Sequence, residues 1–268
     1  MKFIVATVTP FDARGRVDLA RLRAHIMWLS AMGADGFAAT SFAGEFLYLT
    51  DREREAIHRT ILDTARDKQV FPCTWDPSLS TMRYLTEAAR EQGATQILMP
   101  PPLLYDVHDD VVESWYCEVH ELTEMPVLAL HSPKHVHAGL STTLYHRLRD
   151  RGVLAGMQDD SGDIYRLKRT CERDPGAVYA SRDRLLGEAQ TIEQCAGFVS
   201  VLANAWPSFC TRVFRGDDNL NEALVERVNR TRAAGGVPAL KGLLRMGCRA
   251  PLTAVDPTRL ERLPPSEV

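Results

Sequence analysis

Short apolar segments alternate with longer segments of helical period from the N-terminus to about residue 216. Each of the eight strand–helix units takes roughly 27 residues, and a crossover of that length can hold a helix between parallel strands. Eight units within roughly 200–250 residues favour closure into a (β/α)8 TIM barrel over an open sheet. A doubly wound nucleotide-binding sheet is the weaker alternative, because no GxGxxG follows the first strand and no Walker loop occurs.

The expected elements follow from this alternation. The expected strands are Phe3–Val8, Gly36–Thr40, Val70–Thr74, Gln96–Met99, Val127–Leu130, Leu154–Gln158, Ala177–Ala180 and Gly197–Leu202. The helices expected between them include Leu19–Met32, Arg52–Arg66, Thr81–Gln92, Val111–Leu122, Leu144–Asp150 and Tyr165–Arg173. Thr50 followed by Glu53 predicts a capping box at the start of the second helix.

The helical period continues after the last expected strand. Asn219–Ala234 and Val237–Gly247 read as two further helices, followed by a segment punctuated by prolines. They contain too little apolar sequence to form a core of their own. We therefore expect a barrel over residues 1–216 and a C-terminal helical extension, packed on the barrel, over residues 217–268.

Charge and cysteine usage argue against several classes of partner. A formal net charge of -3 and the lack of a basic stripe give no electrostatic basis for binding nucleic acid or an anionic membrane. No apolar run approaches the roughly 18 residues of a membrane span, and the N-terminus does not resemble a signal peptide. The six cysteines show no CxxC or metal-like spacing, which is typical of a cytoplasmic protein with reduced thiols.

The residues that follow each strand are the functional candidates, because barrels of this kind carry their active sites at the C-terminal ends of the strands. Asp163 is placed to cap the helix that follows strand six. Cys73 ends strand three, where we expect a buried structural thiol in preference to a nucleophile. Polar residues follow other strands in "SFAGEF" (41–46), "LHSPKHVH" (130–137), "QDDSGD" (158–163) and "SRDR" (181–184).

Several motifs lie in one order along the chain: "TPF" (9–11), "GE" (44–45), "PVLALHSP" (126–133), "GMQDDSGD" (156–163) and "GFVSVLANAWP" (197–207). Together they resemble the dihydrodipicolinate synthase/N-acetylneuraminate lyase family over nearly the whole chain. The resemblance implies a class I aldolase-like lyase, of the carbon–carbon or carbon–oxygen type, that forms a homodimer or homotetramer. It also implies a small 2-oxo- or hydroxy-carboxylate as ligand. We predict no cofactor and no metal ion.

The chain departs from that family at the residue that would carry the chemistry. The resemblance implies a lysine at the end of strand six that condenses with the keto group of the substrate, and Gln158 stands at this position. The nitrogen of a carboxamide is delocalised into its carbonyl and does not form an iminium with a ketone. We therefore predict that the chain acts without Schiff-base catalysis.

Other family positions change mostly from polar to apolar, which hints at a more hydrophobic ligand. The resemblance implies a tyrosine at Leu130, two threonines at Phe42 and Ala43, an arginine at His135, and at Leu104 a tyrosine from a neighbouring subunit. Backbone amides around Ala43 and Gly44 need no side chain to hold a carboxylate. We predict Gln158, Asp159 and His135 as catalytic residues, and the substrate-binding residues as Phe42, Ala43, Gly44, Leu130 and Leu104.

Four interpretations of the site stay open. Lys134, in the loop after strand five, is a candidate for a displaced Schiff-base lysine, although a solvated loop lysine would have the same position. Noncovalent acid–base chemistry on a keto or hydroxy acid would give a dehydratase, hydratase or lyase. A pseudoenzyme that serves as a ligand-binding or scaffolding barrel would lose the same catalytic residues together.

The fourth interpretation is a metal site. His131, His135 and His137, with Asp159 or Asp160 from the next strand, are candidate ligands of zinc or iron. Strand alternation would turn His131 away from the barrel centre if its neighbour points inward, and loop histidines also bond to backbone. Two charged residues are expected to be structural instead: Glu45 at the base of its loop and Lys241 in packing or interface contacts.

Overall fold

Eight strands and eleven α-helices make up the fold over residues 1–261 and 263–267, which the computed structural model describes. The strands are β1 (Lys2–Ala6), β2 (Gly36–Ala39), β3 (Gln69–Pro72), β4 (Ile97–Met99), β5 (Val127–His131), β6 (Gly156–Asp159), β7 (Val178–Ala180) and β8 (Gly197–Ser200). The helices are α1 (Leu19–Ala31), α2 (Asp51–Ala65), α3 (Leu79–Glu91), α4 (Asp109–Thr123), α5 (Thr142–Asp150), α6 (Ile164–Arg173), α7 (Leu186–Ala189), α8 (Pro207–Phe214), α9 (Asn221–Ala233), α10 (Val237–Leu243) and α11 (Pro257–Leu260).

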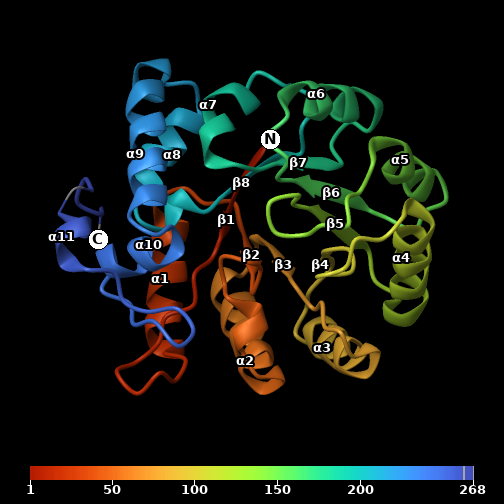
Figure 1. The fold of residues 1–268 in the computed structure, drawn as a ribbon, viewed down its shortest axis with the longest axis horizontal. Helices are drawn as coiled ribbons and strands as arrows, with labels where there is room; N and C mark the ends of the chain where they lie inside the picture. The colour runs from red at the N-terminus through yellow and green to blue at the C-terminus, as the bar shows by residue number, and fades with distance from the viewer. Residues whose placement is uncertain (262, 268) are drawn as a thin grey trace.

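The strands close into a barrel. They form one parallel sheet in the order β3-β2-β1-β8-β7-β6-β5-β4. An isolated parallel bridge between Cys73 and Leu98 joins the two outer strands and completes the ring. Helices α2 to α6 surround the strands in Figure 1. The predicted (β/α)8 TIM barrel is therefore confirmed. No helix in the described ranges is both long and apolar enough to cross a membrane.

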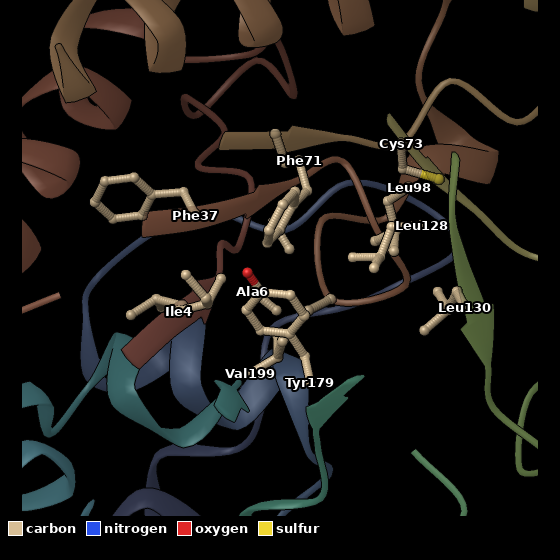
Figure 2. Packing of buried hydrophobic residues seen from close by; sticks show 14 of the residues in the cluster. Ile4, Ala6, Phe37, Phe71, Cys73, Leu98, Leu128, Leu130, Tyr179 and Val199 are labelled. Carbon is tan, nitrogen blue, oxygen red and sulfur yellow. The ribbon is translucent and has the colours of Figure 1, made fainter. Parts of the chain in front are cut away.

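The inside of the barrel is filled by side chains from every part of the ring. Figure 2 shows Ile4, Phe71, Leu128 and Val199 with their side chains gathered between the strands. All four are buried, because strands of a closed parallel sheet have one face in the barrel and the other under helices. The barrel is thus a packed core, and polar chemistry is confined to its ends.

Strand β1 ends at Ala6, two residues before the expected end, because a side chain takes over the hydrogen bonds of the ladder. Asn204 accepts a hydrogen bond from the Val8 N–H at 3.2 Å and donates one to the Ala6 carbonyl at 2.8 Å. The Asn204 oxygen also lies 3.1 Å from His25 Nε2. An amide oxygen only accepts, so His25 carries its proton on Nε2.

Strand β8 also ends two residues early, and here a buried carboxylate is the cause. Asp183 accepts hydrogen bonds from the N–H groups of Val201 and Leu202 at 3.2 and 3.0 Å and from the Ser200 hydroxyl. These bonds turn the chain into a 3-10 helix, η3 (Leu202–Asn204), in place of two further strand residues. Burial raises the pKa of Asp183 to about 6, against the effect of its three donors.

Two helix starts agree with the expected caps. The Thr50 hydroxyl and the Glu53 carboxylate bond reciprocally to each other's backbone N–H at the start of α2. Asp163 caps α6 by accepting from the N–H groups of Tyr165 and Arg166, each at 3.0 Å. The capping box and the Asp163 cap are both confirmed.

The C-terminal helices lie together on one side of the barrel. Figure 1 shows α9, α10 and α11 on the side of α1 and α8. The end of the chain returns to the barrel, where the Glu267 carboxylate accepts from the N–H groups of Ser208 and Phe209 in the first turn of α8. Trp206 donates its indole N–H to the Pro265 carbonyl at 2.7 Å. A boundary between residues 216 and 217 stays a prediction.

Burial of His25 makes the stability of the fold depend on pH. Desolvation lowers the pKa of His25 to about 4, whereas an unfolded chain has a histidine pKa near 6.5. Between these values the unfolded state binds a proton that the folded state does not bind, so stability is lost as the pH falls below about 6.5. We expect H25Q to make this loss shallower by up to about 1.4 kcal/mol per pH unit between pH 6.5 and pH 5.

Urea unfolding at a series of pH values measures this slope. H137Q is the matched control, because His137 is exposed, and its slope should equal that of the wild type. Equal slopes for all three proteins would contradict the assignment.

Candidate active site

Gln158 lies at the C-terminal end of β6 and faces the barrel interior. The strand register places it beside Leu130 of β5 and Tyr179 of β7, both of which Figure 2 shows in the interior. Gln158 is 7% exposed, and its Nε2 donates to the Ser181 hydroxyl at 3.3 Å. Ser181 in turn donates to the Val199 carbonyl at 3.1 Å, so its oxygen must accept from the amide.

The orientation of this amide leaves one strong acceptor free. Gln158 Oε1 is buried and has no hydrogen-bond partner among the described residues. A buried amide oxygen without a partner costs roughly 1–3 kcal/mol, so such groups need an explanation, and functional sites are one. The end of β6 therefore holds a buried polar atom without a partner at the carboxyl end of the barrel.

Asp159 is separated from Gln158 by the alternation of the strand. Its carboxylate forms an ion pair with Arg166 of α6 at 2.8 Å and accepts from the Ser161 N–H at 2.8 Å. Arg166 also donates to the Leu140 carbonyl and the Thr142 hydroxyl, each at 2.8 Å. Asp159 thus holds α6 against the segment after β5. The structure does not bring it to the face of Gln158.

The following residue, Asp160, enters a polar cluster at the mouth. The Ser132 hydroxyl donates to Asp160 Oδ2 at 2.6 Å and lies 2.8 Å from His135 Nδ1. Arg182, after β7, donates its Nε–H to the Asp160 carbonyl at 3.1 Å. The His135 ring stacks on Phe42, with centroids 4.6 Å apart and planes 17° from parallel. The loops after four different strands therefore meet at His135.

Burial and charge set the protonation of this cluster. Desolvation, then Lys134 and Arg182, lower the pKa of His135 to about 4, so its imidazole is neutral at pH 7. Burial raises the pKa of Asp160, and the hydrogen bond from Ser132 with the charges of Arg182 and Lys134 opposes that rise. A neutral histidine at the mouth can accept a proton.

The loop after β2 is wound tightly by backbone conformations that are rare outside glycine. Thr40 has φ +48 and is held by its hydroxyl, which donates to the Cys73 carbonyl at 3.1 Å and bonds to His58 Nε2 at 2.6 Å. A Cβ at Gly44 would lie 2.8 Å from the Thr40 Cα, so only glycine fits there. Glu45 follows with φ +62.

The conformation of this loop determines which backbone N–H groups are free to bind a ligand. Gly44 N–H donates to the Ser41 carbonyl at 2.9 Å, so it is already used. The N–H groups of Phe42 and Ala43 have no partner within the described part of the chain. Two adjacent free N–H groups are suited to holding a carboxylate. The expected amide site thus lies one residue earlier than the pair Ala43 and Gly44.

Glu45 and Lys241 form a fully buried ion pair that links the loop to the C-terminal helices. Lys241 Nζ lies 2.6 Å from Glu45 Oε1 and 4.3 Å from the centre of the Phe11 ring. Lys241 is 0% exposed. Glu45 thus has a structural contact at the base of its loop, and its partner is this lysine. We expected packing or interface contacts for Lys241 and did not predict its ion pair with Glu45.

The remaining predicted ligand-binding residues lie in different surroundings. Leu130 is buried in the barrel beside Gln158. Leu104 lies between β4 and α4, has φ +74 and is 83% exposed, next to the exposed Tyr105. Leu104 therefore does not line a buried site within one chain.

The chain has only five lysines, and the structure accounts for each of them. Lys2 begins β1 and Lys68 precedes β3, so both lie at the end of the barrel opposite to the mouth. Lys168 is exposed on α6, and Lys134 is exposed in the loop after β5. Lys241 is paired with Glu45. No lysine stands at a strand end beside Gln158.

The other candidate groups are not set up for catalysis. Burial raises the pKa of Cys73 to about 11, so its thiol is not ionised at neutral pH. His131 Nδ1 accepts from the Leu140 N–H at 3.2 Å, which occupies that nitrogen. Among residues 1–261 and 263–267, no three His, Cys, Asp or Glu side chains are grouped to hold a metal ion.

One open hollow lies far from these residues. It has a volume of about 620 Å³ and is lined by residues near the starts of β1, β2 and β3, including Lys2, Asp35 and Lys68. This is the N-terminal end of the barrel, where barrels of this class do not carry catalytic groups. The strand-end cluster remains the candidate site.

Fold and site together define a (β/α)8 barrel with its polar groups at the carboxyl ends of the strands. Residues 1–235 match the Dihydrodipicolinate synthetase family, and the chain belongs to that family of lyase-type aldolases. The expected family resemblance is thereby confirmed.

Individual relatives agree with this assignment. The 4-hydroxy-tetrahydrodipicolinate synthase of Pseudomonas aeruginosa is 26% identical over 271 residues, which cover 95% of this chain and 92% of the relative. The fold is similar to dihydrodipicolinate synthase DapA-2 of Bacillus anthracis, with a TM-score of 0.89 and 21% identity over 98% of this chain and 95% of that one. It is also similar to the chloride-inhibited dihydrodipicolinate synthase of Acinetobacter baumannii complexed with pyruvate, with a TM-score of 0.85 and 24% identity over 97% and 95%.

The buried pair of Glu45 and Lys241 should contribute strongly to stability once one partner is removed. K241M leaves the Glu45 carboxylate buried without its cation, which costs about 3–5 kcal/mol. We expect urea denaturation to show a loss of this size. The double variant K241M/E45Q should recover part of it, because no charge is then left unpaired.

K168M is the matched control, since Lys168 is exposed. Its unfolding free energy should lie within about 0.5 kcal/mol of the wild type. A loss in K241M no greater than that in K168M would show that the ion pair is not formed in solution.

Proposed function

We propose that this family member binds a small 2-oxo- or hydroxy-carboxylate at the mouth of the barrel and acts on it without a Schiff base. The observation that carries the proposal is Gln158, whose uncharged amide occupies the end of β6 with a free Oε1. An amide offers hydrogen bonds to a substrate and does not condense with its keto group. The placement of all five lysines away from Gln158 supports the same conclusion.

A carboxylate ligand fits the loop after β2. The free N–H groups of Phe42 and Ala43 would donate to the carboxylate, as backbone amides do in other anion sites. The relative from Acinetobacter baumannii has a structure complexed with pyruvate, a small 2-oxo acid. Leu130 and Phe42 make the surroundings apolar, which favours a ligand with a hydrophobic substituent.

Proton transfer would then be the chemistry of the site. His135 is neutral at pH 7 and is suited to accept a proton from the ligand. Gln158 would hold the oxygen on the neighbouring carbon, since its Nε2 has a second N–H beyond the one donated to Ser181. Hydrogen bonds in an apolar mouth are stronger than in water. Dehydratase, hydratase or noncovalent lyase activity is consistent with this arrangement.

A noncatalytic ligand-binding or scaffolding barrel is the second candidate. The apolar side chains of Phe42, Ala43 and Leu130 favour it, because none of them can transfer a proton. Assembly into a homodimer or homotetramer and a cytoplasmic location belong to the proposal in both cases. The exposed apolar residues Leu104 and Tyr105 are consistent with a surface that a second copy covers.

Trapping with sodium borohydride tests the absence of a Schiff base. We expect the native protein, incubated with pyruvate and borohydride, to keep its intact mass, because no lysine stands at a strand end beside Gln158. The urea-unfolded chain gives the background for exposed amines. A stoichiometric adduct on the native protein, mapped to Lys134 or Lys241, would refute the proposal.

Ligand-induced thermal stabilisation tests whether Gln158 contacts the bound acid. A ligand at ten times its Kd stabilises the folded state by about 1.4 kcal/mol. We expect Q158M, which keeps the side-chain length and removes the amide, to weaken binding by roughly 5–10-fold through the loss of about 1 kcal/mol of hydrogen bonding. Pyruvate, its 2-hydroxy analogue and longer apolar 2-oxo acids are the probes.

Q194M is the control, because Gln194 is exposed, and it should bind as the wild type does. NMR detection of product from a bound acid separates the enzyme from the binding barrel. Binding without turnover would select the second candidate, and equal binding by Q158M would remove Gln158 from the site.

A further inference from the structure

We propose that Asp160 and Ser132 are positioning residues that hold His135 in its Nδ1–H tautomer, so that Nε2 is the proton acceptor at the mouth of the barrel. This inference rests on the proposed function for its purpose, since it assigns the base of the same site. Its evidence is independent of any ligand, because it follows from counting hydrogens in the cluster.

The Ser132 hydroxyl has one proton and two partners. It lies 2.6 Å from Asp160 Oδ2 and 2.8 Å from His135 Nδ1. An ionised carboxylate only accepts, so the hydroxyl donates to Asp160 and has no proton left for the imidazole. Its oxygen must then accept from His135, which places the ring proton on Nδ1. The lone pair of the imidazole is left on Nε2.

Asp160, Ser132 and His135 form a hydrogen-bonded relay, and the backbone fixes both of its ends. His135 and Val136 both donate their N–H groups to the Ser132 carbonyl, at 2.9 and 3.0 Å, in a tight turn after β5. Asp160 donates its N–H to the His131 carbonyl at 2.8 Å, which continues the pairing of β6 with β5. Neither end depends on a flexible side chain for its position. Backbone hydrogen bonds at the carboxyl end of the barrel therefore set the positions of both ends of the relay.

The ring of Phe42 fixes the plane of the imidazole. It stacks on His135 at 4.6 Å between centroids, with 17° between the planes. Phe42 holds the plane of the ring and Ser132 holds its Nδ1 edge, so the direction of the Nε2 edge is fixed. The His135 side chain is 38% exposed. Phe42 belongs to the loop whose free N–H groups are suited to a carboxylate. The base is thereby placed near the atom next to that carboxylate.

The charges around Asp160 influence its protonation, and the protonation of Asp160 determines which ring nitrogen of His135 carries the proton. Asp160 lies 4.0 Å from His135 Nδ1 and 3.7 Å from Arg182 Nε, and Lys134 adds a second positive charge. Asp159 adds a negative charge that raises the pKa of Asp160, and Asp160 in turn raises the pKa of Asp183. If acid protonates Asp160, the carboxyl group donates to Ser132 and the Ser132 hydroxyl then donates to Nδ1, so a neutral ring must carry its proton on Nε2. Nε2 serves as base only while Asp160 is ionised.

The site would accordingly take an acid with a removable proton on the carbon or oxygen beside its carboxylate. A 2-hydroxy acid has such a proton on both atoms, and a 2-oxo acid has one on the next carbon. The proton moves to Nε2, and the electron pair it leaves stays on the substrate beside the Gln158 amide. No metal or second reagent takes part in this step.

The tautomer can be read directly from the unliganded protein. In 15N-histidine-labelled full-length protein, long-range 1H–15N spectra near pH 7 distinguish a protonated ring nitrogen from one with a lone pair. We expect His135 to show a protonated Nδ1 and an unprotonated Nε2. H135Q assigns the signals by their loss, and the exposed His137 serves as internal control.

Variants of the two positioning residues complete the test. S132A and D160A should move His135 toward the Nε2–H form, and S132T, which keeps the hydroxyl, should retain the wild-type form. An Nε2–H form in the wild type overturns the proposal. So does an unchanged tautomer in folded S132A, or loss of the wild-type form in folded S132T.

Failure of the relay and failure of the proposed function give different results. The tautomer is measured without ligand, so it tests the relay even if no acid binds. Addition of pyruvate to the wild type then tests the function, since a ligand at the mouth should shift the Nε2 signal of His135 and leave His137 unchanged. An Nδ1–H tautomer with no response to any carboxylate supports the relay and rejects the function.

Discussion

The parallel pairing of β5, β6 and β7 decides which side chains enter the barrel. In this register Leu130, Gln158 and Tyr179 lie side by side on the inner face. The pleat then sends Asp159 outward to Arg166. Asp160 continues the pairing with β5, returns to the side of Gln158 and accepts from Ser132. Three consecutive polar residues thus have three separate tasks: facing the mouth, fastening α6, and orienting a histidine.

Local sequence predicts most of the fold because its determinants are local. Eight apolar runs, the Thr50 capping box and the Asp163 cap each depend on residues only a few positions apart. The ends of β1 and β8 are set differently. Asn204 reaches β1 from 196 residues away, and Asp183 reaches the end of β8 from the segment that follows β7. No local pattern reports these contacts, so the expected strands are two residues too long.

The site shows the same division between local and distant determinants. Positions at and after strand ends identify Gln158 and His135 as candidates. Side-chain alternation, applied from Gln158, would also have predicted that Asp159 points away from the site. Ser132 is a different case, because its importance comes from the β5–β6 register that brings Asp160 to it. Lys241 is paired with a glutamate 196 residues earlier in the chain. The sequence around a lysine in a C-terminal helix gives no pattern from which such a distant partner could be predicted.

The distribution of charge at the mouth favours one kind of chemistry over another. The groups that we propose to face a ligand are the Gln158 amide, the His135 imidazole and the backbone N–H groups after β2, and all of them are neutral at pH 7. The charges of Lys134 and Arg182 lower the pKa of His135, and Asp160 contacts His135 through Ser132. An iminium is a cation, and an apolar mouth lined by Leu130 and Phe42 would stabilise it poorly without a facing carboxylate. Proton transfer to His135 also creates a cation, but the Asp160 carboxylate lies 4.0 Å from His135 Nδ1 and contacts it through Ser132, so it supplies the counter-charge that an iminium beside Gln158 would lack.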